Sequence, residues 1–229
     1  MLTVVADLVS FSTALRERSR TAHSGSEGAG FMSDLMRGKG TRDDYVALVA
    51  QHWFIYEALE AAASTFAADP VAAPFISEKL TRLPALEADL AYLIGDDWRE
   101  RITPVPTTER YVARIREVQD DAWAGGFVAH HYTRYLGDLS GGQFIGKLMA
   151  RQFELGSNGI GFYVFDEIAD PAAFKDVYRE QLDAAPWDAA EAERVIDEVL
   201  LAYQLNTDLF VDLAAAKAAA SVADTATIA

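Results

Sequence analysis

Three side chains near the start of the chain lie on one face of a predicted helix and could together bind an anionic ligand. Arg16, Arg20 and His23 occupy positions i, i+4 and i+7, which at 100° per residue places them within an arc of about 60°. One interpretation is a solvated basic stripe whose histidine, near a helix C-terminus, suits the helix dipole. The other is an imidazole metal ligand flanked by guanidiniums, suited to a dianionic ligand that carries a metal. The spacing alone favours the solvated stripe.

A second segment holds more glycine than a helix accepts without a reason. Residues 129–149 read AHHYTRYLGDLSGGQFIGKLM, with helix-forming ends and glycine at positions 137, 141, 142 and 146. Each glycine inside a helix costs roughly 1 kcal/mol relative to alanine, so four cost about 4 kcal/mol. Since folding stabilities are typically ~5–15 kcal/mol, something must require bare backbone here.

Three explanations compete for these glycines. Two pairs have the GxxxG spacing that allows close helix–helix packing. The stretch GGQFIGK resembles a phosphate-binding loop, but Leu148 stands where magnesium binding needs Ser or Thr, and no strand precedes it. The third explanation is a flat ligand pressed on the backbone, with Asp138 close enough to order water above it. Heme fits this segment and the first, because imidazole binds its iron and arginines pair with its propionates.

The remaining candidates for metal chemistry are weak. No histidine in the chain has a glutamate three residues before it, and no HExxH motif occurs. These absences argue against a carboxylate-bridged di-iron bundle and a zinc hydrolase. The chain has no cysteine, which excludes disulfides, thiolate metal sites and iron–sulfur clusters.

The composition is that of a globular protein that works in water. The chain has 229 residues, of which 51% are hydrophobic and 24% charged, enough to bury a sizeable core. A net charge of −15 argues against nucleic acid or an anionic membrane as the main partner. No segment reaches the ~18–20 apolar residues of a membrane helix, and the first residues do not resemble a signal peptide. We therefore expect a cytoplasmic, unanchored protein.

The elements that must position these side chains are predicted to be helices. Segments rich in Ala, Leu, Glu and Arg alternate with short Gly and Pro breaks. Capping patterns predict helix starts at Thr41, Asp170 and Asp188. Residues 161–165, which read GFYVF, form the one plausible strand and are too few to found a sheet.

The chain is therefore predicted to be an all-α, single-domain bundle of seven to nine helices. We place the domain at residues 1–219, because neither a repeat nor a linker interrupts them. The alanine-rich residues 220–229 are predicted to be a frayed tail.

Several stretches of the chain resemble one known family. YTRYLGDLSGGQ at 132–143 is similar to the distal-helix signature of the heme oxygenases, and RERSRTAH at 16–23 resembles the helix that carries their proximal histidine. Further similarity lies in FM at 31–32, IYEALE at 55–60, FKDVYR at 174–179 and LNTDLF at 205–210. The distal motif is highly specific, and the stretches follow the family's order over nearly the whole chain. The resemblance implies the heme oxygenase fold, with heme between a proximal helix and a kinked, glycine-rich distal helix.

The resemblance also implies roles for individual residues. His23 would be the proximal iron ligand and Glu27 a nearby partner for it. Asp138 would anchor a distal water network, with Tyr56 bonded to it through water, and the remaining catalytic residues would be Arg134, Gly137, Gly141 and Gly142. The remaining cofactor-binding residues would be Arg16, Arg20, Lys175, Arg179 and Tyr132 at the propionates, Asn206 and Phe210 closing the pocket, and Met32. Arg16 and Arg20 stand where many relatives have lysines, which keeps the charge but changes the hydrogen-bond geometry.

The function implied by the resemblance is cleavage of heme. Heme b would be both cofactor and substrate, with molecular oxygen as co-substrate, and the products would be biliverdin, carbon monoxide and ferrous iron, for iron acquisition from heme. Electrons would come from a ferredoxin, a flavodoxin or a flavin reductase, and the protein would act as a monomer. Two alternatives stay open. One is a non-catalytic heme-binding or transport protein, and the other is an enzyme of the same fold acting on another small cofactor such as thiamine.

Overall fold

The described part of the chain is helical, as its periodicity predicts. The computed structural model describes residues 9–27 and 30–227, and no β-strand occurs in these ranges. The α-helices in them are α1 (Phe11–Glu27), α2 (Gly30–Met36), α3 (Arg42–Phe66), α4 (Leu83–Ile94), α5 (Trp98–Arg101), α6 (Pro106–Asp120), α7 (Ala124–His131), α8 (Gln143–Gln152), α9 (Pro171–Ala184) and α10 (Ala189–Thr227). Two π-helical segments, η3 (Tyr132–Leu136) and η4 (Asp138–Gly142), join α7 to α8, and short 3-10 turns lie at η1 (Ala73–Phe75), η2 (Glu78–Leu80) and η5 (Gly161–Tyr163).

Three helices begin where the sequence predicts their caps. Thr41 starts α3 with a capping box, in which its hydroxyl accepts the backbone N–H of Asp44 and the Asp44 carboxylate accepts that of Thr41. Asp170 accepts two backbone N–H groups in the first turn of α9. Asp188 accepts the N–H of Glu191 in the first turn of α10. Each cap satisfies donors that a helix start leaves unpaired, which stabilises the helix by ~1 kcal/mol.

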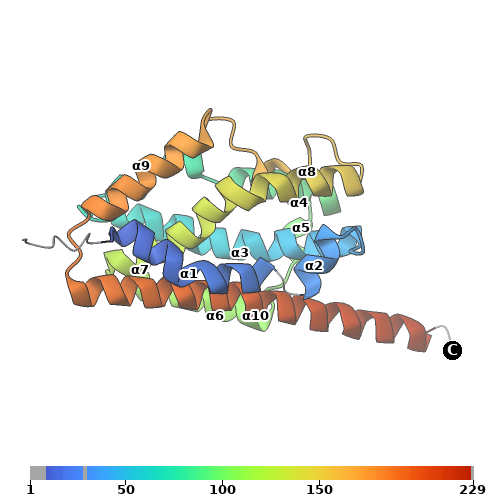
Figure 1. Cartoon of the computed structure of the whole chain (residues 1–229). Coiled ribbons are helices and arrows are strands. Elements are labelled where there is room, and N and C mark those ends of the chain that lie inside the picture. Colours follow the sequence, from blue (N-terminus) through green and yellow to red (C-terminus); the bar gives the residue numbers. More distant parts are fainter. Residues whose placement is uncertain (1–8, 28–29, 228–229) are drawn as a thin grey trace, which may run out of the picture.

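The long helix α10 organises the bundle. It runs along one side of the molecule, where α1, α6 and α7 pack against it (Figure 1). Helix α3 crosses the middle and contacts α4 and α6, while α8 and α9 lie on the side away from α10. Two polar contacts tie α1 in place: the Ser12 N–H donates to Asp183 of α9 at 2.7 Å, and Arg18 pairs with Glu193 of α10 at 2.6 Å.

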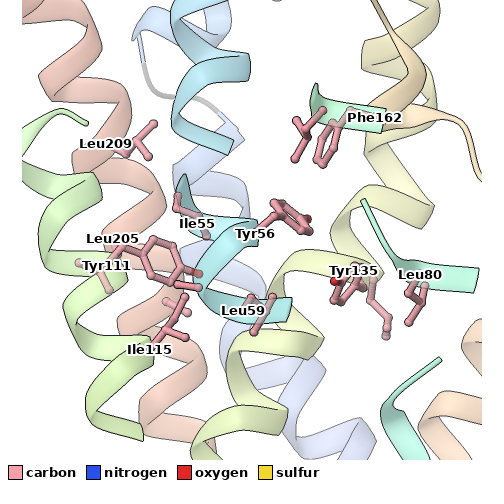
Figure 2. Packing of buried hydrophobic residues seen from close by; sticks show 14 of the residues in the cluster. Ile55, Tyr56, Leu59, Leu80, Tyr111, Ile115, Tyr135, Phe162, Leu205 and Leu209 are labelled. Atoms are coloured by element: carbon pink, nitrogen blue, oxygen red, sulfur yellow. The ribbon is translucent and has the colours of Figure 1, made fainter. Parts of the chain in front are cut away.

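The apolar core lies between α3, α6 and α10. Figure 2 shows Ile55 and Leu59 of α3 close to Tyr111 of α6 and Leu205 of α10, and all four are buried. Burying one such side chain contributes roughly 1.5–3 kcal/mol, so this face fixes the three helices firmly. Tyr56, on the other face of α3, points toward η3 and η5 (Figure 2).

The predicted strand at residues 161–165 is wrong. Its first residues form the 3-10 turn η5, because the buried Asp89 carboxylate of α4 accepts the backbone N–H groups of Gly161 at 2.9 Å and Phe162 at 2.8 Å. A carboxylate that gathers successive N–H groups favours a turn over an extended chain. The turn places Tyr163 beside the glycine-rich helix and Phe162 against His52 and Tyr56 of α3.

The end of α10 continues beyond the boundary predicted for the domain. The helix is continuous to Thr227, past residue 219. Fraying of the tail at 220–229 stays a prediction.

Candidate functional site

The helix that carries the glycines is wound differently from its neighbours. Helix α7 passes into η3 and η4 before α8, and the π-helical hydrogen bonds in these segments join residues five apart instead of four. The hydroxyls of Thr133 and Ser140 donate to the carbonyls of Ala129 and Leu136, at 2.9 and 2.7 Å. Such winding is rare inside α-helices, and where it occurs it is often found at a functional site.

A cavity of about 460 Å³ opens between this helix, α1 and the neighbouring helices. Arg16, Arg20 and His23 of α1 all line it, so the basic stripe borders a cavity and is not merely a solvated face. The other lining residues are Glu17, Ser19, Tyr132, Leu136, Gly137, Ser140, Arg179 and Tyr203. Four of the residues expected at the propionates therefore meet at one cavity: Arg16 and Arg20 of α1, Tyr132 of η3 and Arg179 of α9.

A second cavity of about 130 Å³ adjoins the first, because both share His23, Gly137 and Tyr203 as lining residues. Its walls come from α1, α2, α3, η3, η4, α8, η5 and α10. Besides His23 and Gly137, the expected site residues that line it are Met32, Arg134, Asp138, Gly141, Gly142, Asn206 and Phe210. Six of the lining residues were not predicted as site residues, and they are Leu48, His52, Thr133, Ile145, Tyr163 and Tyr203.

The glycines divide between two of the competing explanations. A Cβ on Gly137 would meet no heavy atom within 4 Å, so bare backbone faces open space there. A Cβ on Gly146 would lie 2.6 Å from the Cβ of Tyr163, so that glycine allows η5 to pack closely on α8. Packing explains Gly146, whereas Gly137 leaves its backbone accessible from the cavity.

Asp138 is bonded to Tyr56 directly, which corrects the predicted water-mediated contact. The Tyr56 hydroxyl of α3 donates to the Asp138 carboxylate of η4. Burial raises the pKa of Asp138 to about 6, although the charges of Arg134 and Arg82 and the Tyr56 hydrogen bond oppose the shift. A carboxyl with this pKa can both hold and release a proton near neutral pH.

Arg134 is held from several sides. One Nη donates to the Asn206 side-chain oxygen at 2.9 Å and the other to Nδ1 of His52 at 3.1 Å. The guanidinium lies over the rings of Tyr56 and Tyr111, 5.2 and 5.6 Å from their centroids. Its Nε is buried and has no hydrogen-bond partner among the described residues, a donor that an ordered water or ligand would satisfy.

The other expected residues take varied positions. His23 is half-buried and lies edge-to-face with Tyr203, at 5.6 Å between ring centroids. Lys175 donates to the Ser140 hydroxyl at 3.0 Å, and Arg179 forms an ion pair with Asp176 three residues earlier. The side chain of Glu27, the expected partner of His23, lies outside the described residues.

Two further histidines belong to the core. His130 bonds to Glu198 at 2.9 Å, and Glu198 also accepts two bonds from Arg114. Burial raises the pKa of Glu198, but the hydrogen bonds from His130 and Arg114 outweigh it and lower the pKa to about 2. Burial lowers the pKa of His131 to about 3, so this ring stays neutral beside Tyr178. Both histidines have partners within the bundle that account for them.

The comparisons with known proteins agree with this arrangement. A model of the heme oxygenase family matches residues 9–212. The chain belongs to the heme oxygenase family. It is 40% identical to heme oxygenase 1 of Homo sapiens, covering 88% of this chain and 71% of that protein, and 36% identical to heme oxygenase 1 of Synechocystis sp., covering 90% and 85%. The structure of the Synechocystis heme oxygenase-1, solved in complex with heme, superposes with a TM-score of 0.87 at 34% identity, covering 96% of this chain and 100% of that one.

A heme oxygenase from Leptospira interrogans is also similar, with a TM-score of 0.82 at 31% identity, covering 88% of this chain and 98% of that one. The all-α architecture of this chain is thus the heme oxygenase fold. Within the described ranges, none of the helices combines the length and hydropathy of a transmembrane segment.

Proposed function

We propose that this protein binds heme and cleaves it, with oxygen and electrons, to biliverdin, carbon monoxide and ferrous iron. One observation carries the proposal: two adjoining cavities share an imidazole, His23, and a bare stretch of helix backbone at Gly137. A flat macrocycle needs both features, an axial ligand and a wall without side chains. Neither a thiamine-sized substrate nor simple heme carriage explains the half-buried carboxyl of Asp138 beside them.

The residues present fit heme. The imidazole of His23 is a ligand type that iron accepts, and the cavity beside it carries Arg16, Arg20 and Arg179, which can pair with two propionates. Met32, Asn206 and Phe210 would border the heme from the smaller cavity. Tyr132, Lys175 and Arg179 would hold its polar edge.

The protein's own residues would position the reaction and supply protons. Bound heme supplies the redox chemistry, because its iron activates oxygen. Asp138, bonded to Tyr56, would hold or release a proton at the distal side, with Arg134 fixing the local charge. The bare backbone at Gly137 would leave room for a small ligand beside bound heme. The positive residues at the polar edge would fix the rotation of bound heme and hence which carbon bridge is cleaved.

The positive edge of the cavity would also receive the electron donor. Arg16, Arg20 and Arg179 line the larger cavity, and Lys175 donates to Ser140, another of its lining residues. An acidic ferredoxin, a flavodoxin or a flavin reductase would dock there with the help of charge complementarity. We infer a monomer that acts in the cytoplasm and serves iron acquisition from heme.

Titration with hemin followed by turnover tests the proposal. The purified protein should take up one heme per chain with a Soret band, and the band should disappear with a reductant and oxygen as biliverdin forms. His23→Ala should change the iron coordination spectrum and abolish turnover, while Asp138→Ala should retain heme but lose most of the biliverdin. Absence of stoichiometric uptake would refute the site, and uptake without ring opening would support the heme carrier instead.

A further inference from the structure

A second histidine, His52, lines the smaller of the two cavities, which we call the distal cavity, and it has no role in the function proposed above. His52 lies on α3, one turn before Tyr56, and faces the cavity that also contains His23, Asp138 and Gly142. It is half-buried, unlike the two core histidines of α7, which are buried. Its position at the cavity wall makes it accessible to whatever occupies the cavity.

The contacts of His52 determine which ring nitrogen carries the proton. Nδ1 lies 3.1 Å from an Nη of Arg134, and a guanidinium can only donate. Nδ1 must therefore accept, and the proton of the neutral ring is on Nε2. Within residues 9–27 and 30–227, Nε2 has no protein hydrogen-bond partner.

The ring is also fixed in orientation and charge. It stacks on Phe162 of η5 at 4.9 Å between centroids, with 23° between the planes, and meets Tyr56 edge-on. Burial, together with the positive charge of Arg134, lowers the pKa of His52 well below its ordinary value. The other ionisable groups that line this cavity are His23, Arg134, Asp138, Tyr163 and Tyr203. Asp138 is already bonded to Tyr56.

We propose that His52 is a hydrogen-bond donor of the distal cavity. Arg134 fixes its tautomer, Phe162 fixes its plane, and Nε2–H donates to a small hydrogen-bond acceptor bound in the cavity next to heme. The inference rests on the proposed function, since heme provides the site at which such an acceptor binds. It assigns to His52 a role that a residue packed only for shape would not have.

Fluoride binding to the ferric heme complex tests this donor without turnover. Fluoride is a small anion that binds ferric heme and accepts hydrogen bonds, so its Kd reports donors in the cavity. His52→Leu, which keeps the bulk but has no donor, should raise the fluoride Kd about five- to tenfold, the effect of losing one hydrogen bond. His52→Gln can accept from Arg134 and donate from its amide, so its Kd should stay within twofold of wild type. Equal Kd values for wild type and His52→Leu, or equal loss in both variants, would overturn the proposal.

Nitrogen NMR of the protein without heme gives an independent test. Long-range proton–nitrogen spectra should show His52 as a neutral ring protonated on Nε2 at pH 7. A ring protonated on Nδ1, or on both nitrogens, would overturn the assignment. Failure to bind hemin at all would refute the proposed function, whereas hemin cleavage with unchanged fluoride affinity in His52→Leu would refute only the role of His52. Melting curves and hemin titrations of both variants serve as folding controls.

Discussion

Near neutral pH, the ionised carboxylate of Asp138 lowers the stability of the folded protein. Replacing Asp138 with asparagine should therefore stabilise the heme-free protein. Burial raises the pKa of this carboxyl from 3.8 to about 6, against the opposing effects of Arg134, Tyr56 and Arg82. Asparagine resembles the protonated acid in shape and keeps an oxygen that can accept the Tyr56 hydrogen bond. The substitution removes the charge that burial disfavours.

The size of the effect follows from the pKa of Asp138. A shift of about two units at roughly 1.36 kcal/mol per unit amounts to about 3 kcal/mol. Because the folded state binds this proton more tightly than the unfolded chain, the contribution of Asp138 to stability is most favourable below pH 3.8 and is lost as the pH rises through 6. We expect Asp138→Asn to increase the free energy of unfolding by about 2–3 kcal/mol at pH 7.5 and by close to zero near pH 4. At pH 7.5 this corresponds to a rise in Tm of roughly 5–10 °C.

Thermal and denaturant unfolding of the heme-free protein at both pH values measures the effect. The matched control is Asp197→Asn, an exposed aspartate on α10, whose replacement should change Tm little at either pH. A gain of the same size at pH 4 and pH 7.5 would mean that helix propensity, and not the buried charge, is responsible. No gain at pH 7.5 would contradict the pKa of Asp138 on which the reasoning depends.

Three further predictions concern the glycines, the buried ion pair and the positive edge. Gly137→Ala should weaken hemin binding while leaving the stability of the heme-free protein unchanged or raising it by about 0.5–1 kcal/mol. Gly146→Ala should lower that stability by about 1–3 kcal/mol, because its Cβ would meet Tyr163 at 2.6 Å. Melting curves and hemin titrations distinguish the two variants. Glu198→Gln should lower the free energy of unfolding at pH 7 by about 3 kcal/mol. The pKa of Glu198 is lowered to about 2, so its ionised carboxylate stabilises the folded state fully above pH 4.5. Denaturant unfolding should show the difference between variant and wild type vanishing as the pH falls toward 2. Arg179→Glu should slow reduction by an acidic electron donor at low ionic strength, and stopped-flow rates should converge with wild type at high salt; rates of the wild type that do not depend on salt would contradict electrostatic docking.

The sequence carries the local features of this protein well. Capping patterns locate the starts of α3, α9 and α10, and the spacing of Arg16 and His23 places them on the face of α1 that borders the cavity. The excess of glycine also identifies the correct helix. Each of these features depends on residues within two turns of one another, where the chain geometry is fixed by the helix itself.

The contacts between distant segments could not be predicted in the same way. The direct bond between Tyr56 and Asp138 joins residues 82 positions apart, so it depends on how the bundle packs and not on local sequence. The turn at Gly161 replaces the predicted strand because Asp89, also distant in sequence, supplies a carboxylate. His52 and Tyr163 are among the cavity residues that the sequence analysis missed, and for His52 the spacing of four residues from Tyr56 was the available signal.

The π-helical winding between α7 and α8 has a consequence for how this wall of the cavity can change in length. A π turn is equivalent to one extra residue accommodated within an α-helix. Removing one residue from 132–142 would let one of the two π-helical segments relax to α-helical winding. Helix α7 would still pack against α10, and Gly146 would still contact Tyr163. Deletions and insertions here would redirect the side chains facing the ligand and spare the scaffold on either side, so the pocket of a descendant protein could be reshaped by changes of a single codon.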